Sequence, residues 1–343
     1  MPESTKKTTI YDLAELAGTS AGTVSAVING NWEKRRISRK LATKVLRLAD
    51  EHGFALNMQA RALSRERSGM IGMIVPMYDN RYFSSIAQGF EARARDAGYF
   101  PIVTCTRRDP DLELAAARAM LGYQVERLIC TGTTDPDRLH DLCSHANVPT
   151  TNLDLPGTKA TSIISDNFQG ALDLTLALLD RFPGAEPDAV FIGGRDTDHN
   201  TRERIRGFKE AFARRGMPLD DARILPCGYA ADKASSALRE YAGAGGVVPE
   251  LLFVNSTISL EGIISALEDI TGPAAKKPTL GCFDWDPFAA RISQDIIMVR
   301  QDVDRMLEAL FDVIAHPADE GAGTVQLIEV PTILDDRAAR FGT

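Results

Sequence analysis

The chain has 343 residues, of which 44% are hydrophobic and 25% are charged, and its formal net charge at pH 7 is −8. These values are typical of a water-soluble globular protein with two or three domains. The sequence has no apolar run of about 18 residues, no apolar signal-peptide core and no paired cysteine motif. It therefore predicts a cytoplasmic protein with no membrane span, no metal site and no other cofactor.

The charge is distributed unevenly along the chain. Residues 1–67 contain twelve Lys or Arg and seven Asp or Glu, a net charge of +5, whereas residues 68–343 have a net charge of −13. A basic segment attracts phosphate and an acidic segment repels it. The division favours a DNA-binding head on a body with another task; a solvated basic arm without a partner is the alternative.

Residues 9–31, TIYDLAELAGTSAGTVSAVINGN, predict two short helices joined by a tight turn. An amphipathic segment ends at Gly18, and Ser20 offers a side-chain oxygen that can cap a second helix. The second helix consists mostly of small residues, which let a helix lie close to the floor of a groove. This pattern favours a helix-turn-helix unit for DNA, with an ordinary helical hairpin as the alternative.

A third helix and a linking segment complete the N-terminal part. Ser38 can cap a helix that ends at Gly53, and three helices of this size make a module of about 50 residues. Residues 57–67 are Arg-rich and only weakly apolar, so on their own they would form a marginal helix. A plain linker is the alternative.

From Gly69 onward, apolar runs alternate with helical patterns. Strands are expected near 69–77, 100–105, 127–131, 148–153, 162–165, 188–193, 251–255, 279–283 and 296–299. Helices are expected near 84–97, 110–121, 167–179, 201–214, 232–241 and 258–270. This alternation predicts an α/β fold with doubly wound parallel sheets, and the number of strands predicts two lobes.

The helix-turn-helix with its TVSAVING core, the third helix, the segment 57–63 and the two-lobed α/β body together resemble the LacI/GalR family of bacterial transcription regulators. The resemblance covers essentially the whole chain. It implies a DNA-binding domain over 1–56, a hinge helix over 57–67, and an effector-binding and dimerisation domain over 68–343. It also implies lobes of the periplasmic-binding-protein type, the first over about 69–165 and 301–326 and the second over about 166–300 and 327–343.

In this family the second helix enters the major groove of DNA and the hinge helix enters the minor groove. Ala26 stands where relatives often carry a long side chain such as Arg, so it can only touch a thymine methyl or leave room for a neighbour. Leu63 matches a leucine that is wedged between central base pairs. The DNA-contacting residues implied by the resemblance are Thr9, Tyr11, Ser20, Ala21, Gly22, Thr23, Ser25, Ala26, Asn29, Arg35, Arg36, Asn57, Ala60 and Leu63.

The body resembles sugar-binding proteins that hold a ligand between two lobes, beyond the carboxyl ends of the strands. The implied effector-binding residues are Tyr82, Phe83, Asp154, Asp166, Arg204, Tyr229, Asn255, Asp284 and Gln301. Taken singly, each is equally well explained as a strand-end cap or a surface charge. The loop INGNWEKRRIS resembles the fructose-repressor branch, but Leu155 stands where that branch has an arginine. We expect a small sugar or sugar phosphate, fructose-like, either free or phosphorylated.

The resemblance implies a repressor of carbohydrate genes rather than an enzyme. A homodimer would bind a pseudo-palindromic operator, and ligand binding in the cleft would lower the affinity for DNA, although the opposite polarity also occurs in the family. A Rossmann-type enzyme is disfavoured because the first strand is not followed by GxGxxG and no P-loop is present. A transport-type binding protein would have no use for the basic head. A constitutive DNA-binding protein with an unused cleft is the remaining alternative.

Overall fold

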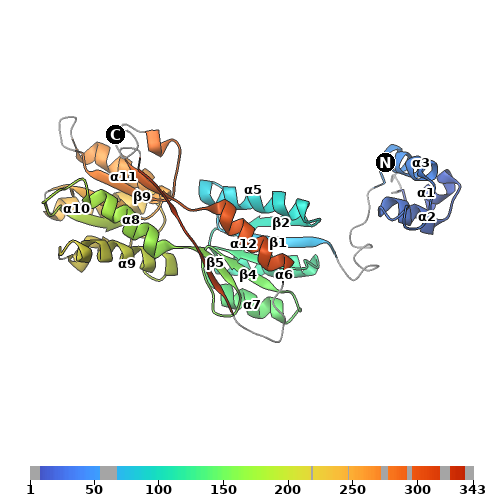
Figure 1. Cartoon of the computed structure of the whole chain (residues 1–343), viewed down its shortest axis with the longest axis horizontal. Coiled ribbons are helices and arrows are strands. Elements are labelled where there is room, and N and C mark those ends of the chain that lie inside the picture. The colour runs from blue at the N-terminus through green and yellow to red at the C-terminus, as the bar shows by residue number, and fades with distance from the viewer. Residues whose placement is uncertain are drawn as a thin grey trace, which may run out of the picture. The chain divides into compact units, whose positions relative to one another are not determined.

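The computed structural model describes residues 8–54, 68–217, 219–245, 247–271, 277–291, 296–316 and 325–336. The chain separates into two units, a head over residues 1–68 and a body over residues 69–343 (Figure 1). None of the described helices is long and apolar enough to cross a membrane.

Local sequence signals define the helices of the head. These helices are α1 (Ile10–Ala17), α2 (Ala21–Ile28) and α3 (Arg39–Glu51). Thr9 and Asp12 form a capping box at the start of α1, and Gly18 ends α1 with a left-handed φ of 70°. Ser20 caps α2, because its Oγ accepts a hydrogen bond from the Thr23 N–H at 3.2 Å. The turn expected at Gly18 is therefore produced by capping at both of its ends.

A small apolar core holds the three helices of the head together. Leu13, Val24 and Val45 come from different helices and are fully buried. The ammonium group of Lys44 donates a hydrogen bond at 3.0 Å to the Ala17 carbonyl at the end of α1. Lys44 thus serves the fold of the head, because it binds a carbonyl that the helix leaves unpaired.

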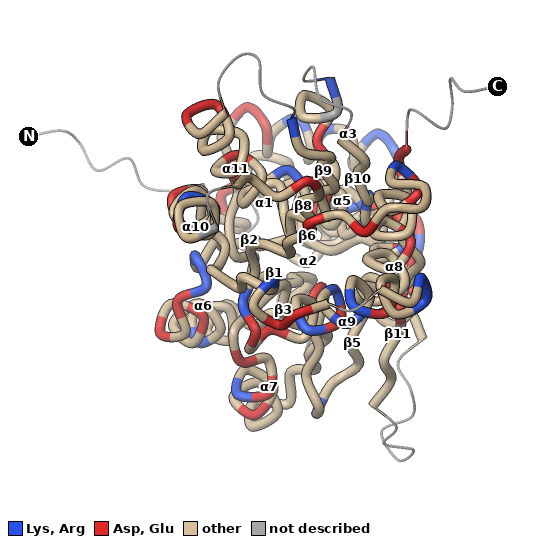
Figure 2. Tube along the Cα trace, turned by 90° about the vertical axis from the view of Figure 1, so that its left-hand side faces the viewer, with Lys and Arg blue, Asp and Glu red and all other residues tan. Residues whose placement is uncertain are grey.

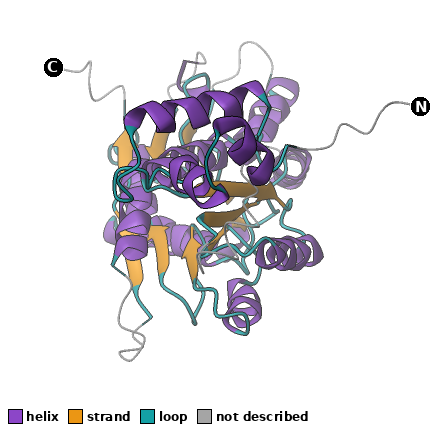
Figure 3. Ribbon diagram, turned by 90° about the vertical axis from the view of Figure 1, so that its right-hand side faces the viewer, coloured by secondary structure: helices purple, strands orange, loops and turns teal. Residues whose placement is uncertain are grey.

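Lobe one of the body is built on a six-stranded sheet in the order β11-β5-β4-β3-β1-β2. Its strands are β1 (Met70–Val75), β2 (Phe100–Cys105), β3 (Leu128–Thr131), β4 (Thr150–Leu153), β5 (Ser162–Ser165) and β11 (Leu327–Val330). Its helices are α5 (Arg81–Asp96), α6 (Pro110–Gly122), α7 (Pro136–Ser144) and α12 (Val303–Ala315). Helices α5 and α12 pack on one face of the sheet, and α6 and α7 pack on the other. Helices lie on both sides of the strands of the body (Figure 3).

Lobe two repeats this arrangement with the strand order β12-β10-β9-β8-β6-β7. Its strands are β6 (Ala189–Ile192), β7 (Ile224–Leu225), β8 (Leu251–Val254), β9 (Thr279–Phe283), β10 (Ile297–Arg300) and β12 (Ile333–Asp335). Its helices are α8 (Asn167–Leu179), α9 (His199–Arg214), α10 (Ala231–Gly245) and α11 (Thr257–Ile270), with 3-10 turns at Asp221–Arg223 and Ala289–Arg291. In the core, Phe191 and Phe253 stack with their ring centres 4.9 Å apart.

The two lobes are therefore pseudo-equivalent. Strands β1 to β5 of lobe one correspond in sheet position to β6 to β10 of lobe two, and β11 corresponds to β12. All strand pairs are parallel except β10 with β12. Because parallel strands end at the same edge, each lobe brings its strand-end residues together at one edge.

Helices α6, α7 and α9 on the outside of the body carry charges of both signs (Figure 2).

The expected lobe boundary near residue 326 is wrong. Residues 327–330 form β11 and pair with β5 in lobe one, so the chain crosses to lobe two only after Val330. The strand was missed because it is a short edge strand, with Leu327 52% exposed. Helix α12 and strand β7 were also missed, although α12 buries Met306, Leu307 and Leu310 at helical spacing.

Candidate functional site

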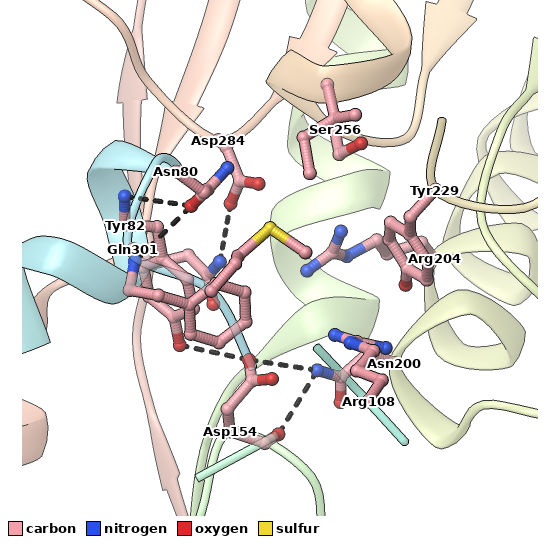
Figure 4. A pocket seen from close by; sticks show the side chains of 13 residues that line it. Asn80, Tyr82, Arg108, Asp154, Asn200, Arg204, Tyr229, Ser256, Asp284 and Gln301 are labelled. Carbon is pink, nitrogen blue, oxygen red and sulfur yellow. Dashed lines mark hydrogen bonds between the residues drawn. The ribbon is translucent and has the colours of Figure 1, made fainter. Parts of the chain in front are cut away.

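A pocket lies between the two lobes of the body, at the strand ends of both sheets (Figure 4). Its lining consists of Met77, Asn80, Tyr82, Phe83, Arg108, Asp154, Asn200, Arg204, Tyr229, Ser256, Ile258, Asp284 and Gln301. Seven of the nine residues expected to bind a ligand are in this set: Tyr82, Phe83, Asp154, Arg204, Tyr229, Asp284 and Gln301. The structure thus brings together side chains that are up to 219 positions apart in the sequence, from Tyr82 to Gln301.

Two aspartates occupy equivalent places in the two lobes. Asp154 directly follows β4, and Asp284 directly follows β9, the corresponding strand of lobe two. Both have left-handed backbones, with φ of 75° and 77°. Such a conformation is uncommon for a residue with a side chain and tends to occur at binding sites. Each lobe therefore offers one carboxylate from the same structural position.

The carboxylate of Asp154 is buried within a polar network. Its Oδ1 accepts hydrogen bonds from the Tyr82 hydroxyl at 3.0 Å and from Asn200 Nδ2 at 3.3 Å. Burial raises the pKa of Asp154 to about 6, against the opposing effect of Arg108 and Arg204. Asp154 thus remains mostly ionised at neutral pH and is ready to accept hydrogen bonds from ligand hydroxyls.

A second network of hydrogen bonds holds Asp284, and it includes residues next to the segments that connect the two lobes. Its Oδ1 accepts a hydrogen bond at 2.5 Å from Nε2 of Gln301, and Oε1 of Gln301 accepts one at 2.6 Å from Ser165 Oγ. Burial raises the pKa of Asp284, and the charge of Arg204 opposes this effect. The Gln301 side chain therefore links a pocket carboxylate of lobe two to the end of a strand of lobe one.

Arg204 on α9 is 3% exposed and points toward the centre of the pocket (Figure 4). Its Nε donates to Asn167 Oδ1 at 2.8 Å, and its Nη1 donates to the Asn255 carbonyl at 2.7 Å. The guanidinium carbon lies 3.7 Å from the ring centre of Phe283. These contacts hold the charge in one orientation, in which it faces both pocket carboxylates.

Two expected ligand-binding residues do not line the pocket. Asp166 caps α8, because its Oδ1 accepts a hydrogen bond from the Gln169 N–H at 2.8 Å. The side chain of Asn255 is fully buried and packs against Gly194 outside the pocket lining, while its carbonyl holds Arg204. In this structure Asp166 is used by a helix end, and the carbonyl of Asn255 orients Arg204.

Arg108 and Asn200 line the pocket but were not identified from the sequence. The guanidinium of Arg108 pairs with Asp198 at 3.3 Å and lies 4.7 Å from the ring centre of Tyr229. A usable signal was present, because Arg108 lies three residues after the expected strand 100–105, near its carboxyl end. Asn200 gave no such signal, because it lies within the first turn of α9.

Several contacts connect the two lobes across the pocket. Arg81 of lobe one pairs with Asp286 of lobe two at 2.9 Å, and Arg108 pairs with Asp198. The cavity left between the lining side chains has a volume of about 20 Å³, which is room for one or two water molecules. A ligand of the size of a sugar must therefore separate the lobes or displace lining side chains when it enters.

The surface of the head has several of the polar groups expected to contact DNA. Tyr11 is 75% exposed, Thr9, Ser20, Gly22, Arg35 and Arg36 are exposed, and Ala21, Thr23, Ser25 and Asn29 are half-buried. Asn29 donates from Nδ2 to the Ser25 carbonyl at 2.8 Å, which orients its side chain at the end of α2. Asn57, Ala60 and Leu63 lie outside the described residues.

Ala26 differs from expectation. It is only 6% exposed, although it lies on the helix that was expected to enter the major groove. The head in this conformation presents almost none of Ala26 to a groove. Base reading along α2 is therefore left to its exposed and half-buried residues.

Comparison with known proteins assigns the head and the body to known protein families. Residues 9–57 match the profile of the bacterial regulatory proteins of the lacI family, and residues 71–315 match that of the periplasmic binding protein domain. The ribitol operon repressor of Klebsiella aerogenes is 57% identical over 193 residues, which cover 55% of this chain and 72% of the relative. The chain belongs to the lacI family of bacterial regulatory proteins. The fructose operon regulatory protein of Vibrio cholerae is 29% identical over 265 residues, covering 76% of this chain and 78% of the relative.

Solved structures of the lacI family share the fold of this member. The Lac repressor dimer bound to operator and the anti-inducer ONPF superimposes with a TM-score of 0.79 at 21% identity, covering 96% of this chain and 98% of the other. The Cra regulator from Pseudomonas putida in complex with fructose 1-phosphate gives a TM-score of 0.69 at 18% identity, covering 78% and 98%. In this lacI-family chain, α1 and α2 form the DNA-binding helix-turn-helix of a transcription regulator.

Proposed function

We propose that this lacI-family regulator represses genes for the use of a small polyhydroxylated carbon source, and that such a compound binds the pocket between the lobes and lowers the affinity for operator DNA. The observation that carries the proposal is the pocket itself, with one strand-end carboxylate from each lobe and Arg204 between them. The 57% identity to a ribitol operon repressor supports a small polyol or sugar as the ligand class.

The position of the pocket explains how a ligand can change the affinity for DNA. A ligand that binds Asp154 of lobe one together with Arg204 and Asp284 of lobe two stabilises one relative arrangement of the lobes over others. The equilibrium between two arrangements of the lobes can shift only by the difference in the free energy with which the ligand binds each of them. A ligand can therefore change the arrangement of the lobes only if it binds groups of both lobes differently in the two states. This pocket has hydrogen-bonding groups from both lobes.

On the DNA side, we propose that two chains form a homodimer on a pseudo-palindromic operator in the cytoplasm, without any catalytic activity. Helix α2 would enter the major groove, with Tyr11, Arg35 and Arg36 binding the backbone. Leu63, which lies outside the described residues, would wedge into the minor groove. Replacing Leu63 by Ala is expected to weaken operator binding strongly and to leave ligand binding unchanged.

The experiment uses the full chain and an operator selected in vitro from random DNA. Fluorescence anisotropy follows release of the labelled operator as ribitol, D-ribulose or fructose is added. The Arg204→Met variant should bind operator like the wild type but lose the response to ligand, because it lacks the guanidinium that faces both pocket carboxylates. The matched control is Arg206→Met, which removes an exposed arginine of the same helix and should leave the response intact.

Two results would contradict the proposal. An Arg204→Met variant that responds like the wild type would place the ligand elsewhere. A thermal-shift screen in which no sugar or polyol raises the melting temperature would favour a constitutive DNA-binding protein, because a ligand that binds the folded state at 100 times its Kd adds about 2.7 kcal/mol of stability.

A further inference from the structure

The ion pair between Arg108 and Asp198 joins the two lobes beside the pocket. Asp198 stands at the N-cap position of α9, where an aspartate normally accepts a hydrogen bond from the helix backbone. Here it makes no such bond, and its Oδ2 lies 3.3 Å from Nη1 of Arg108 instead. Asp109 and Asp302, at the N-caps of α6 and α12, do cap their helices in the usual way.

We propose that Asp198 makes the pocket selective for an uncharged polyol or sugar over its phosphorylated counterpart, because it holds Arg108 in a buried ion pair. This inference rests on the proposed function, since it concerns the ligand of the same pocket. Asp198 does not line the pocket, whereas Arg108 does. Asp198 is therefore a positioning residue, and it acts on the ligand through Arg108.

Burial makes this pair effective. The side chains of Arg108 and Asp198 are only 8% and 14% exposed, so water screens their charges weakly. The guanidinium also lies over the rings of Tyr229 at 4.7 Å and Phe83 at 5.9 Å. The carboxylate offsets the charge of the guanidinium, so the attraction of Arg108 for the phosphate of a ligand is weakened. Removing only the carboxylate would leave an uncompensated buried cation that attracts anions.

The second guanidinium group of the pocket, that of Arg204, is already partly engaged. Arg204 already donates to Asn167 and to the Asn255 carbonyl. Arg108 and Arg204 lie among the carboxyl groups of Asp154, Asp198 and Asp284, so the pocket offers a dianionic phosphate no unopposed positive charge.

The hydrogen-bonding groups favour hydroxyls for a separate reason. In the described part of the chain, Oδ2 of Asp154 and Oδ2 of Asp284 accept no hydrogen bond, and Nε of Arg108 is buried without an acceptor. A hydroxyl both donates and accepts, so a polyol can satisfy all three atoms. A phosphate group only accepts, so where it takes the place of a hydroxyl beside one of these carboxylate oxygens, that oxygen is left without a donor. Leaving such groups unpaired in a buried site is costly.

Isothermal titration of the full-length protein at pH 7.5 tests the inference with two matched pairs of compounds. The uncharged members are ribitol and D-ribulose, and the charged members are ribitol 5-phosphate and D-ribulose 5-phosphate. We expect the wild type to bind at least one uncharged member about a hundredfold more tightly than its phosphate. Asp198→Asn should reduce this ratio about tenfold or more, mainly by tighter binding of the phosphate.

Two further variants separate selectivity from a merely structural effect. Asp198→Glu keeps the charge and should keep the wild-type ratio, which a general disturbance of α9 would not restore. Asp196→Asn removes an exposed carboxylate two residues away and should change neither affinity. The ratio of two affinities measured on one variant is insensitive to partial unfolding, because unfolded protein lowers both apparent affinities by the same factor.

Each outcome has one meaning. A wild type that binds a phosphate as tightly as its uncharged partner, or more tightly, overturns the inference but leaves the proposed function standing. A selective wild type whose ratio is unchanged in Asp198→Asn overturns the role of Asp198. Binding of none of the four compounds overturns the proposed ligand class and the inference with it.

Discussion

The Asp154→Asn variant should gain stability relative to the wild type as the pH rises from about 4 to about 6. Burial, opposed by Arg108 and Arg204, raises the pKa of Asp154 to about 6, whereas a carboxyl group in an unfolded chain titrates near 3.9. Between these values the folded protein binds more protons than the unfolded chain. The contribution of Asp154 to stability is therefore complete below about pH 4, falls as the pH rises, and is level above about pH 6.

The magnitude follows from the same two pKa values. One pKa unit corresponds to about 1.4 kcal/mol, so the folded state loses ~3 kcal/mol across the interval because of Asp154. Asparagine does not titrate, and its Oδ1 can still accept hydrogen bonds from the Tyr82 hydroxyl and Asn200 Nδ2. About two thirds of this change falls between pH 4.5 and pH 7.5, so the difference in the free energy of unfolding, variant minus wild type, should increase by ~2 kcal/mol over that range.

Urea unfolding of both full-length proteins at pH 4.5, 5.5, 6.5 and 7.5, followed by circular dichroism, measures this difference. The control is Asp137→Asn. Burial alone would raise the pKa of Asp137, but hydrogen bonds from Thr158 and Lys159 outweigh this effect and lower it. Both the lowered pKa of Asp137 in the folded state and its unfolded value of about 3.9 lie below this pH range, so the difference for that variant should stay constant. A difference for Asp154→Asn that is constant or decreases with pH would refute the reasoning about burial.

Three substitutions test packing and capping elsewhere in the chain. Gly262→Ala would place a Cβ 1.8 Å from the Ala231 carbonyl oxygen; it should cost about 3 kcal/mol and lower the melting temperature by roughly 6–12 °C, and a melt equal to that of the wild type would contradict this packing. Gly243→Ala on exposed α10 has open space around it and should stabilise by about 0.5–1 kcal/mol, whereas a lower melting temperature would argue against a regular helix there. Ser20→Ala removes the cap on Thr23 and should cost about 1 kcal/mol, seen as roughly fivefold faster amide exchange in α2; unchanged exchange would show that the cap contributes little.

The sequence predicted the helices of the head and most of the strands of the body because both depend on short-range signals. Ser20 and Ser38 cap the helices that they were expected to cap, since capping involves residues only three positions apart. The buried strands are continuous apolar runs, as in β1 and β8, and need no tertiary information to be recognised. Edge strands such as β11 lack that signal, because one side of the strand faces solvent.

Much of the pocket was also accessible from sequence, through the rule that parallel strands present their carboxyl-end residues at one edge. The rule identifies positions but not the direction of a side chain. Asp166 and Gln301 follow the equivalent strands β5 and β10. Gln301 binds Asp284 in the pocket, whereas Asp166 turns to cap α8. The position of the next helix decides between the two roles, because Asp166 is itself the N-cap of α8, whereas α12 is capped by Asp302, one residue after Gln301.

The sequence by itself determined the family, the order of the domains and the type of most buried elements, because these depend on local patterns read along the chain. The tertiary structure alone decided which residues meet. Arg108 and Asp198 are 90 positions apart on different lobes, and nothing in either local sequence specifies their ion pair. Ala26 is buried in the folded head, with an exposure of only 6%. Both outcomes depend on how packed elements exclude water, which is a property of the assembled fold.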